Sequence, residues 1–255
     1  MPVDSVRKAE AGAVALGTAE FDLMLSAGRQ AADIIYHNYP QANRFLFFCG
    51  GGNNGGDALV AADLLFRRYH REVMVYSVKE LNKFTGCAAL AAKQLSAEIC
   101  VIDSAMLRRE DILPGDVIVD GLLGIGFRGG ALRREVQSMI AVANAVRNPV
   151  ISLDLPSGMN GDSGEISPDG AVNADLTITF GAVKPGLFLP TAVHCAAGCV
   201  WLKSDYPFPE IRAKKFLPIS MPLICWQYRR LIAIKIPGAG YWSGAAAKSI
   251  RELRF

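Results

Sequence analysis

The chain lacks any long apolar run. None of its 255 residues lies in an uninterrupted apolar stretch near the roughly 18 residues that a membrane-spanning helix needs. The start of the chain carries Asp4, Glu10 and Glu20 and has no apolar block of the kind found in a secretory leader. We therefore expect a cytoplasmic protein with no membrane partner.

The chain also has no strong excess of basic or of acidic residues. Lysine and arginine total 27 against 24 acidic residues, which leaves a formal charge of +3. The basic residues are scattered, apart from short clusters at residues 67–68 and 214–215 that are typical of solvated faces. The composition gives no support for a nucleic-acid partner.

The six cysteines do not form a disulfide framework. They are spread along the chain, several of them inside apolar runs, which is typical of a reduced compartment. His194, Cys195 and Cys199 lie close together, but their spacing is not that of a zinc site and their surroundings are apolar. We expect these three residues to pack in the core.

The most informative segment is a strand, a glycine-rich loop and a helix in succession. Residues 45–49 form an apolar run, glycines dominate the loop, and residues 58–69 have helical periodicity. Gly50, Gly52 and Gly55 have the Gly-x-Gly-x-x-Gly spacing in the strand-to-helix context that it requires. Free N–H groups and the positive end of the helix dipole attract phosphate at such a position.

Three oxygen-bearing side chains accompany these glycines. Asn53, Asn54 and Asp57 are not needed by a plain dinucleotide loop, and they indicate a polar ligand contact, a hard cation, or both. A glycine-rich turn without a ligand is the alternative. It is disfavoured because a turn needs only one or two glycines and each additional one is destabilising.

The rest of the chain alternates between strands and helices. This alternation predicts an α/β fold with a mostly parallel sheet covered on both faces, and ligands in such folds lie outside the carboxyl ends of the strands. The expected helices are 4–16, 19–37, 84–97 and 132–146, and the expected further strands are 73–78, 98–102, 117–120, 149–154, 174–180 and 198–202.

Three further strand ends carry polar groups beside glycines. Asp120 opens a second glycine-rich loop that extends to residue 130, in which Arg128 could add a charged fork for phosphate. Asp154 begins a Pro-Ser-Gly turn, and Lys184 follows the next strand. Each alone could be a flexible connector or a solvated turn residue. Together they favour one site along the sheet edge.

Four segments resemble, in this order, the YjeF N-terminal domain family, which comprises the NAD(P)H-hydrate epimerases. They are CGGGNNGGD at 49–57, VDGLLGIG at 119–126, DLPSG at 154–158, and ADLTITF with a following KPG between 174 and 186. The similarity covers roughly residues 5 to 205. Gly51 and Ala58 depart from residues that are frequent in the family, and neither departure removes a charged group.

The resemblance implies a Rossmann-like three-layer αβα sandwich, a homodimer and a bound potassium ion. It implies an isomerase that interconverts the R and S epimers at C6 of hydrated NADH and NADPH, in nicotinamide nucleotide repair. Asp154 and Lys184 match the catalytic positions, and Asn54, Asp120 and Ser157 match the potassium ligands. The residues that match the dinucleotide site are Asn53, Asn54, Gly55, Gly56, Asp57, Gly124, Ile125, Gly126, Phe127, Arg128, Gly129, Gly130 and Asp154.

The resemblance fades near residue 206. We expect residues 1–206 to form the epimerase domain and residues 207–255 to be a diverged or truncated tail. Residues 236–247 faintly resemble the glycine-rich start of a fused dehydratase domain, which the remaining residues are too few to build. Dehydratase activity is therefore expected to be absent.

Two other functions stay open at this point. An NAD(P)-dependent oxidoreductase would use the same glycines, with Glu80 as a ribose-binding acid after the second strand. A non-enzymatic binding or scaffolding module would use the fold alone. The chain has no Ser-x-x-Tyr-x-x-x-Lys set, which disfavours the first, and it keeps Asp154 and the Asn-Asn-Gly-Gly-Asp segment, which disfavours the second.

Overall fold

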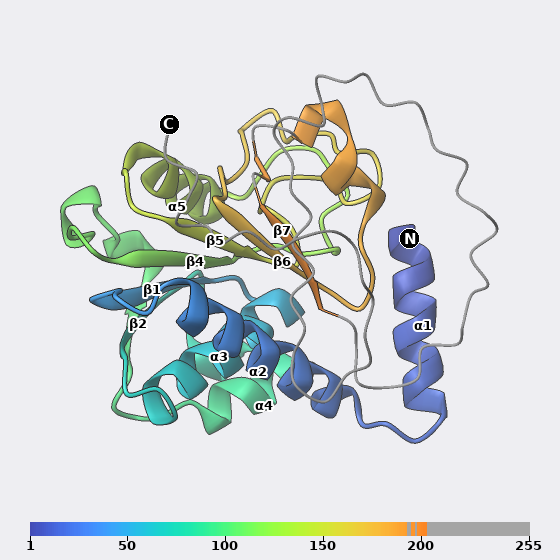
Figure 1. Ribbon diagram of the computed structural model, residues 1–255, viewed down its shortest axis with the longest axis horizontal. Coiled ribbons are helices and arrows are strands. Elements are labelled where there is room, and N and C mark those ends of the chain that lie inside the picture. The colour runs from blue at the N-terminus through green and yellow to red at the C-terminus, as the bar shows by residue number, and fades with distance from the viewer. Residues whose placement is uncertain (193–194, 197, 203–255) are drawn as a thin grey trace.

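The computed structural model describes residues 1–192, 195–196 and 198–202. Seven strands form one sheet in the order β3-β2-β1-β4-β5-β6-β7 (Figure 1), and every neighbouring pair is parallel. The strands are β1 (Arg44–Cys49), β2 (Glu72–Ser77), β3 (Cys100–Asp103), β4 (Val117–Gly121), β5 (Val150–Leu153), β6 (Leu176–Phe180) and β7 (Cys199–Leu202).

Helices cover both faces of this sheet. Figure 1 shows α2, α3 and α4 on one face, α5 on the other, and α1 standing apart from both layers. The helices are α1 (Val3–Ala15), α2 (Glu20–Asn38), α3 (Asn53–Arg67), α4 (Gly86–Gln94) and α5 (Arg134–Ala145). Short 3-10 helices lie at Leu81–Lys83, Ser104–Met106, Arg109–Asp111, Pro185–Phe188 and Pro190–Ala192.

The strand order reverses between β1 and β4. From β1 the chain runs outward through α3, β2 and α4 to β3, and it then returns to the other side of β1 and continues through β4 to β7. The loops that follow β1 and β4 therefore diverge toward opposite faces of the sheet. A crevice opens at such a switch point, and this is where doubly wound folds bind ligands.

The central strands are apolar on both faces because both are covered. In β1, Phe45 and Phe47 belong to the core beneath α2, α3 and α4, whereas Leu46 and Phe48 belong to the core beneath α5. All four side chains are fully buried. Burial of this kind favours the continuous hydrophobic runs found in parallel sheets.

The predicted α/β class and the three-layer sandwich are confirmed, and most element boundaries agree with the predicted ranges to within a few residues. One prediction about the site is wrong in its local structure. Residues 53–57 are not a loop before the helix, because α3 begins at Asn53 and includes them in its first turns. The predicted tail at residues 207–255 lies outside the described residues.

Further expectations concern cysteines and membrane helices. Of the five cysteines within the described residues, Cys49, Cys87 and Cys195 are buried, Cys199 is half-buried, and Cys100 is exposed. The burial of Cys195 agrees with the expected core position. His194 and Cys225 lie outside the described residues. None of the helices in the described part of the chain is long and apolar enough to cross a membrane.

Candidate active site

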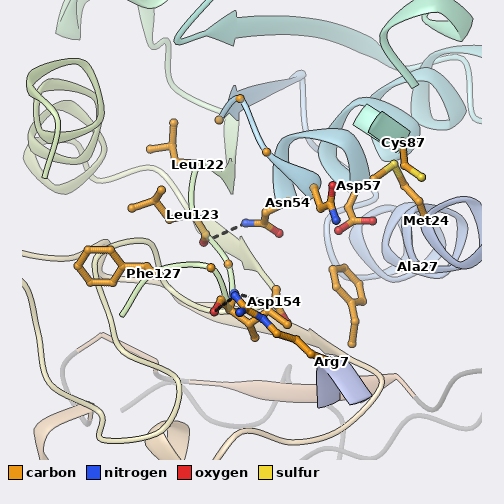
Figure 2. A pocket seen from close by; sticks show the side chains of 18 of the residues that line it. Arg7, Met24, Ala27, Asn54, Asp57, Cys87, Leu122, Leu123, Phe127 and Asp154 are labelled. Carbon is orange, nitrogen blue, oxygen red and sulfur yellow. Dashed lines mark hydrogen bonds between the residues drawn. The ribbon is translucent and has the colours of Figure 1, made fainter. Parts of the chain in front are cut away.

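A cleft of about 1430 Å³ lies at the carboxyl ends of the strands, where the strand order reverses. The loops after β1 and β4 form its two walls, and α1 and α2 contribute Arg7, Glu10, Met24 and other side chains. Figure 2 shows Asp57 on one side with Met24 and Cys87, Phe127 on the other side, and Asn54 and Asp154 between them.

The predicted site residues divide into two groups. The first group lines the cleft and consists of Asn53, Asn54, Asp57, Gly124, Ile125, Gly126, Phe127, Arg128, Gly129 and Asp154. The second group does not line it. Of this group Gly55, Gly56, Asp120, Ser157 and Lys184 are buried behind the wall, whereas Gly130 is exposed.

The glycine loop is held closely against the start of α3. A Cβ on Gly55 would lie 1.9 Å from the carbonyl oxygen of Gly50, and one on Gly50 would lie 1.8 Å from that of Leu122. These backbone segments belong to the two walls of the cleft. The absence of side chains at Gly50 and Gly55 therefore lets the first helical turn approach both loops.

We expect Gly55→Ala to lower the free energy of unfolding by about 1–3 kcal/mol, because backbone atoms must shift to admit the methyl group. Gly126→Ala is the matched control, since its Cβ would meet nothing within 4 Å. Urea unfolding followed by circular dichroism measures both variants. Equal midpoints for the two would show that the close contact at Gly55 carries no constraint.

Asn54 connects three of these segments through its side chain. Its amide nitrogen donates hydrogen bonds to the carbonyl oxygens of Leu123, at 3.0 Å, and Leu153, at 3.1 Å (Figure 2 shows the first). Its amide oxygen is buried and has no hydrogen-bond partner. Buried polar atoms are rarely left unpaired, so this oxygen is available for a ligand.

Asp120 lies next to Ser152 on the neighbouring strand, in register, and is fully buried. Its carboxylate accepts four hydrogen bonds, from the hydroxyls of Ser152 and Ser157 and from the backbone N–H groups of Leu122 and Ser157. Burial raises the pKa of this carboxyl, against the opposing effect of the hydrogen bonds. Among the described residues no lysine, arginine or histidine forms an ion pair with it.

The hydroxyl of Ser157 joins Asp120 to the second loop. Its oxygen lies 2.5 Å from a carboxylate oxygen of Asp120 and 3.2 Å from the carbonyl oxygen of Leu123, and it accepts a hydrogen bond of 2.8 Å from the N–H of Leu123. Because Asn54 also donates to the carbonyl oxygen of Leu123, the three predicted cation ligands belong to one hydrogen-bonded network. The part of the chain that the structure describes contains no group of three or more His, Cys, Asp or Glu side chains arranged to hold a metal ion.

Asp154 has an unusual backbone conformation. Its φ is +65°, in the left-handed region that non-glycine residues seldom adopt, although aspartate and asparagine tolerate it best. One carboxylate oxygen accepts the N–H of Ile125 at 2.9 Å, and a Cβ on Gly124 would come within 2.7 Å of it. The strained backbone thus directs this carboxylate against the second loop, inside the cleft.

Lys184 is almost completely buried, with 1% of its side chain exposed. Its ammonium group donates to the carboxylate of Asp154, to the hydroxyl of Thr179 at 3.0 Å and to the carbonyl oxygen of Phe180 at 2.7 Å. An ammonium group has three donors, and all three are used here. Lys184 therefore holds the carboxylate of Asp154 in place from its buried side and does not line the cleft itself.

Two further carboxyl groups face the same cleft. The pKa of Asp57 is raised well above its ordinary value by burial and then by the negative charges of Asp154 and Glu10, although part of its surface is open to the cleft. Glu10, on α1, has a pKa raised by burial and then by Asp154. Perturbed carboxyl groups gathered in one cleft are typical of functional sites.

Arg128 lines the cleft, and its guanidinium group pairs with Asp4 and, at 3.3 Å, with Asp162. A contact between Arg128 and a phosphate would replace these exposed ion pairs, and it stays a prediction. Arg7 and Glu10 were not predicted as site residues. They lie on an amphipathic helix, and the periodicity of α1 alone does not indicate which surface it covers. Arg7 donates to the carbonyl oxygen of Ile125 at 3.3 Å, which places α1 beside the second loop.

Known proteins are similar to this chain over most of its described residues. The family model described as YjeF-related protein N-terminus matches residues 20–186. An NAD(P)H-hydrate epimerase from Limosilactobacillus fermentum is 34% identical over 68% of this chain and 80% of its own length. An NAD(P)H-hydrate epimerase from Rhodopirellula baltica is 41% identical over 64% of this chain and 66% of its own length.

Longer relatives match over the same part of the chain. A bifunctional NAD(P)H-hydrate repair enzyme from Coxiella burnetii is 38% identical over 73% of this chain, which spans only 37% of that protein. Among solved structures, that of a yeast protein superposes with a TM-score of 0.63 and 23% identity, covering 72% of this chain and 81% of the yeast chain. The likeness to the yeast protein supports the fold.

Proposed function

Because the chain belongs to the family of YjeF-related protein N-termini, we propose that it is an NAD(P)H-hydrate epimerase. It would be an isomerase that interconverts the R and S epimers at C6 of hydrated NADH and NADPH. The names of several curated relatives point to the same activity. We further propose, from the family resemblance, that residues 1–206 form this domain and that it acts as a cytoplasmic homodimer.

The observation that best supports this proposal is the position of Asp154. Its carboxylate lines the cleft at the switch point and is held by the N–H of Ile125 on one oxygen and by the buried ammonium group of Lys184 on the other. A group that is held in this way combines fixed geometry with a proton-accepting oxygen, which acid–base catalysis requires.

Epimerisation at C6 needs proton transfer but no redox partner. The hydroxyl at C6 can leave and return on the other face, or the ring can open and close again, and each route needs a group that takes up and returns a proton. We assign this role to Asp154. Lys184 is a positioning residue, because its three donors are occupied and it keeps the adjacent carboxylate oriented.

The two loops are suited to the phosphates of the dinucleotide. The first turn of α3 lines the cleft at Asn53 and Asn54, and the free N–H groups and the dipole at the start of a helix favour an anion there. Across the cleft, the backbone from Gly124 to Gly129 forms the opposite wall. We propose that the hydrated nicotinamide lies toward Asp154 and that the phosphates lie between these walls.

We propose that a potassium ion binds to side-chain oxygen atoms of residues near Leu123. The unpaired amide oxygen of Asn54, the hydroxyl of Ser157 and the carboxylate of Asp120, which has no cationic partner among the described residues, would hold it. Hard oxygen donors of this kind suit alkali and alkaline-earth cations. A bound cation would offset the buried charge of Asp120 and keep the two loops in place beside the substrate.

We expect KCl to raise the midpoint of thermal unfolding above that in choline chloride at the same ionic strength, because a ligand that binds only the folded state stabilises it. Ser157→Ala, which removes one donor oxygen, should abolish most of this difference. The difference should also shrink as the pH falls, because protonation of Asp120 removes the charge that the cation neutralises. Ser163→Ala, an exposed hydroxyl outside the cleft, is the control. The same midpoint in both salts would contradict the cation site.

The structure gives no support for Glu80 as the ribose-binding acid of an oxidoreductase. Glu80 does not line the cleft, and its exposed carboxylate pairs with Lys83 at 2.7 Å. A spectroscopic test separates the two activities, since oxidation or reduction changes the absorbance of the nicotinamide band and epimerisation does not. A scaffolding module stays an alternative only if the cleft proves inactive.

The activity itself is tested by incubating one purified epimer of the NADPH hydrate with the protein and separating the epimers by chromatography. We expect the other epimer to appear faster than in buffer, without a change in redox state. Failure of the second epimer to appear would overturn the proposed function.

A further inference from the structure

Lys79 is a positively charged side chain that lines the cleft and has no role in the proposed reaction. It follows β2, is half-buried, and lines the cleft on the side of the first glycine loop. Within the described residues it forms no ion pair, whereas the neighbouring Lys83 pairs with Glu80 outside the cleft. A partly buried ammonium group that faces a ligand cleft without a carboxylate partner is suited to an anionic group of the ligand.

The chain holds Lys79 in this position through several contacts. The N–H of Val78 donates to the carbonyl oxygen of Cys49 at 3.1 Å, which ties the end of β2 to the end of β1. The hydroxyl of Ser77 donates to the carbonyl oxygen of Lys79 at 2.7 Å. The ammonium group lies 5.0 Å from the centre of the Phe84 ring, in a cation–π contact.

The side chain of Lys79 packs over Gly51, where a larger residue would leave it no room. A Cβ on Gly51 would lie 2.5 Å from Cε and 3.0 Å from Nζ of Lys79. The methylene groups of the lysine therefore cross directly over the backbone of the glycine loop. Any larger residue at position 51 would push the ammonium group away from the loop.

The position of Lys79 in the fold indicates which anionic group of a bound dinucleotide would lie next to it. In doubly wound folds the residue at the end of the second strand lies beside the adenosine ribose of a dinucleotide bound at the first glycine loop. An acidic side chain there binds the free ribose hydroxyls, whereas a basic one accommodates a 2′-phosphate. Here Glu80 lies outside the cleft and Lys79 lines it.

We propose that Lys79, held across Gly51 and against Phe84, binds the 2′-phosphate of the dinucleotide and makes this cleft selective for the hydrate of NADPH over that of NADH. This inference rests on the proposed function for the identity of the substrate. The 2′-phosphate is also present in NADP⁺ and absent from NAD⁺, so the selectivity can be measured by binding alone, without turnover.

The test compares the dissociation constants of NADP⁺ and NAD⁺ by calorimetry on the full chain at low salt. We expect NADP⁺ to bind at least about 10-fold more tightly than NAD⁺, as for one hydrogen bond between charged groups. Lys79→Gln should remove this preference by weakening NADP⁺ alone. Lys83→Gln, which removes a charge from the same segment outside the cleft, should leave the preference unchanged.

Gly51→Ala tests whether the position of the Lys79 ammonium group matters, in addition to its charge. It keeps Lys79 but displaces its side chain, so we expect part of the preference for NADP⁺ to be lost at an unchanged net charge. Equal binding of both nucleotides by the unaltered chain, no binding of either, or a preference that survives Lys79→Gln would each overturn the inference. Epimerisation without any NADP⁺ preference would refute the role of Lys79 only, whereas preference without epimerisation would refute the proposed function only.

Discussion

Asp154→Asn should reduce the rate of epimer interconversion by about 10²- to 10⁴-fold, the contribution that a positioned acid–base group typically makes. Asparagine suits the test because it tolerates the left-handed backbone of this position, where φ is +65°. The amide also keeps an oxygen that can accept a hydrogen bond from Lys184 or from Ile125. What it loses is the ability to take up and release a proton.

The measurement is the initial rate of appearance of the second epimer, with NADP⁺ affinity and the unfolding midpoint recorded for the same preparation. Nucleotide affinity should change little, because the proposed phosphate positions are at the two loops. Glu165→Gln, an exposed carboxyl outside the cleft, is the control and should keep the full rate. An Asp154→Asn variant that retains the full rate would remove this residue from the mechanism.

Lys184→Met should lower the free energy of unfolding by about 3–5 kcal/mol, because it leaves the carboxylate of Asp154 without its cationic partner in a nearly dry site. The side chains of the pair are only 1% and 8% exposed, so solvent compensates little. The hydroxyl of Thr179 and the carbonyl oxygen of Phe180 would lose their donor as well. Chemical denaturation gives the change in free energy directly.

A double variant distinguishes the loss of the ion pair from the loss of packing. If the unpaired charge is the cause, Asp154→Asn combined with Lys184→Met should be more stable than Lys184→Met alone, because the second substitution removes the buried charge. Lys83→Met serves as the control, since this lysine pairs with Glu80 in solvent and its loss should have little effect. A double variant less stable than both single variants would indicate that packing dominates.

The sheet and the position of the site were predictable from the sequence because both depend on local signals. Buried parallel strands appear as short apolar runs, and a carboxylate at the end of a run, such as Asp120 or Asp154, marks the edge where the strands terminate. The motifs of the epimerase family then grouped these strand ends into one site. The cleft is lined by Asn53, Asn54 and Asp57 from the first predicted segment and by residues 124–129 from the second.

What the sequence did not indicate depends on long-range contacts. The early start of α3 at Asn53 runs against the low helix propensity of Gly55 and Gly56, and packing of the first turn on Gly50 outweighs that propensity. The three partners of Lys184 meet only after β6 has paired with β5. The place of α1 over the cleft is fixed by contacts far along the chain, such as that of Arg7 with Ile125.

The most direct measurement follows the epimer ratio from both directions. Pure R hydrate and pure S hydrate of NADPH are incubated separately with the unaltered protein in potassium buffer, and the two epimers are quantified over time. If the cleft epimerises C6, both reactions converge on one common ratio much faster than the buffer blanks, while the total amount of hydrate stays constant. If each epimer persists at the rate of its blank, the cleft around Asp154 is not an epimerase site.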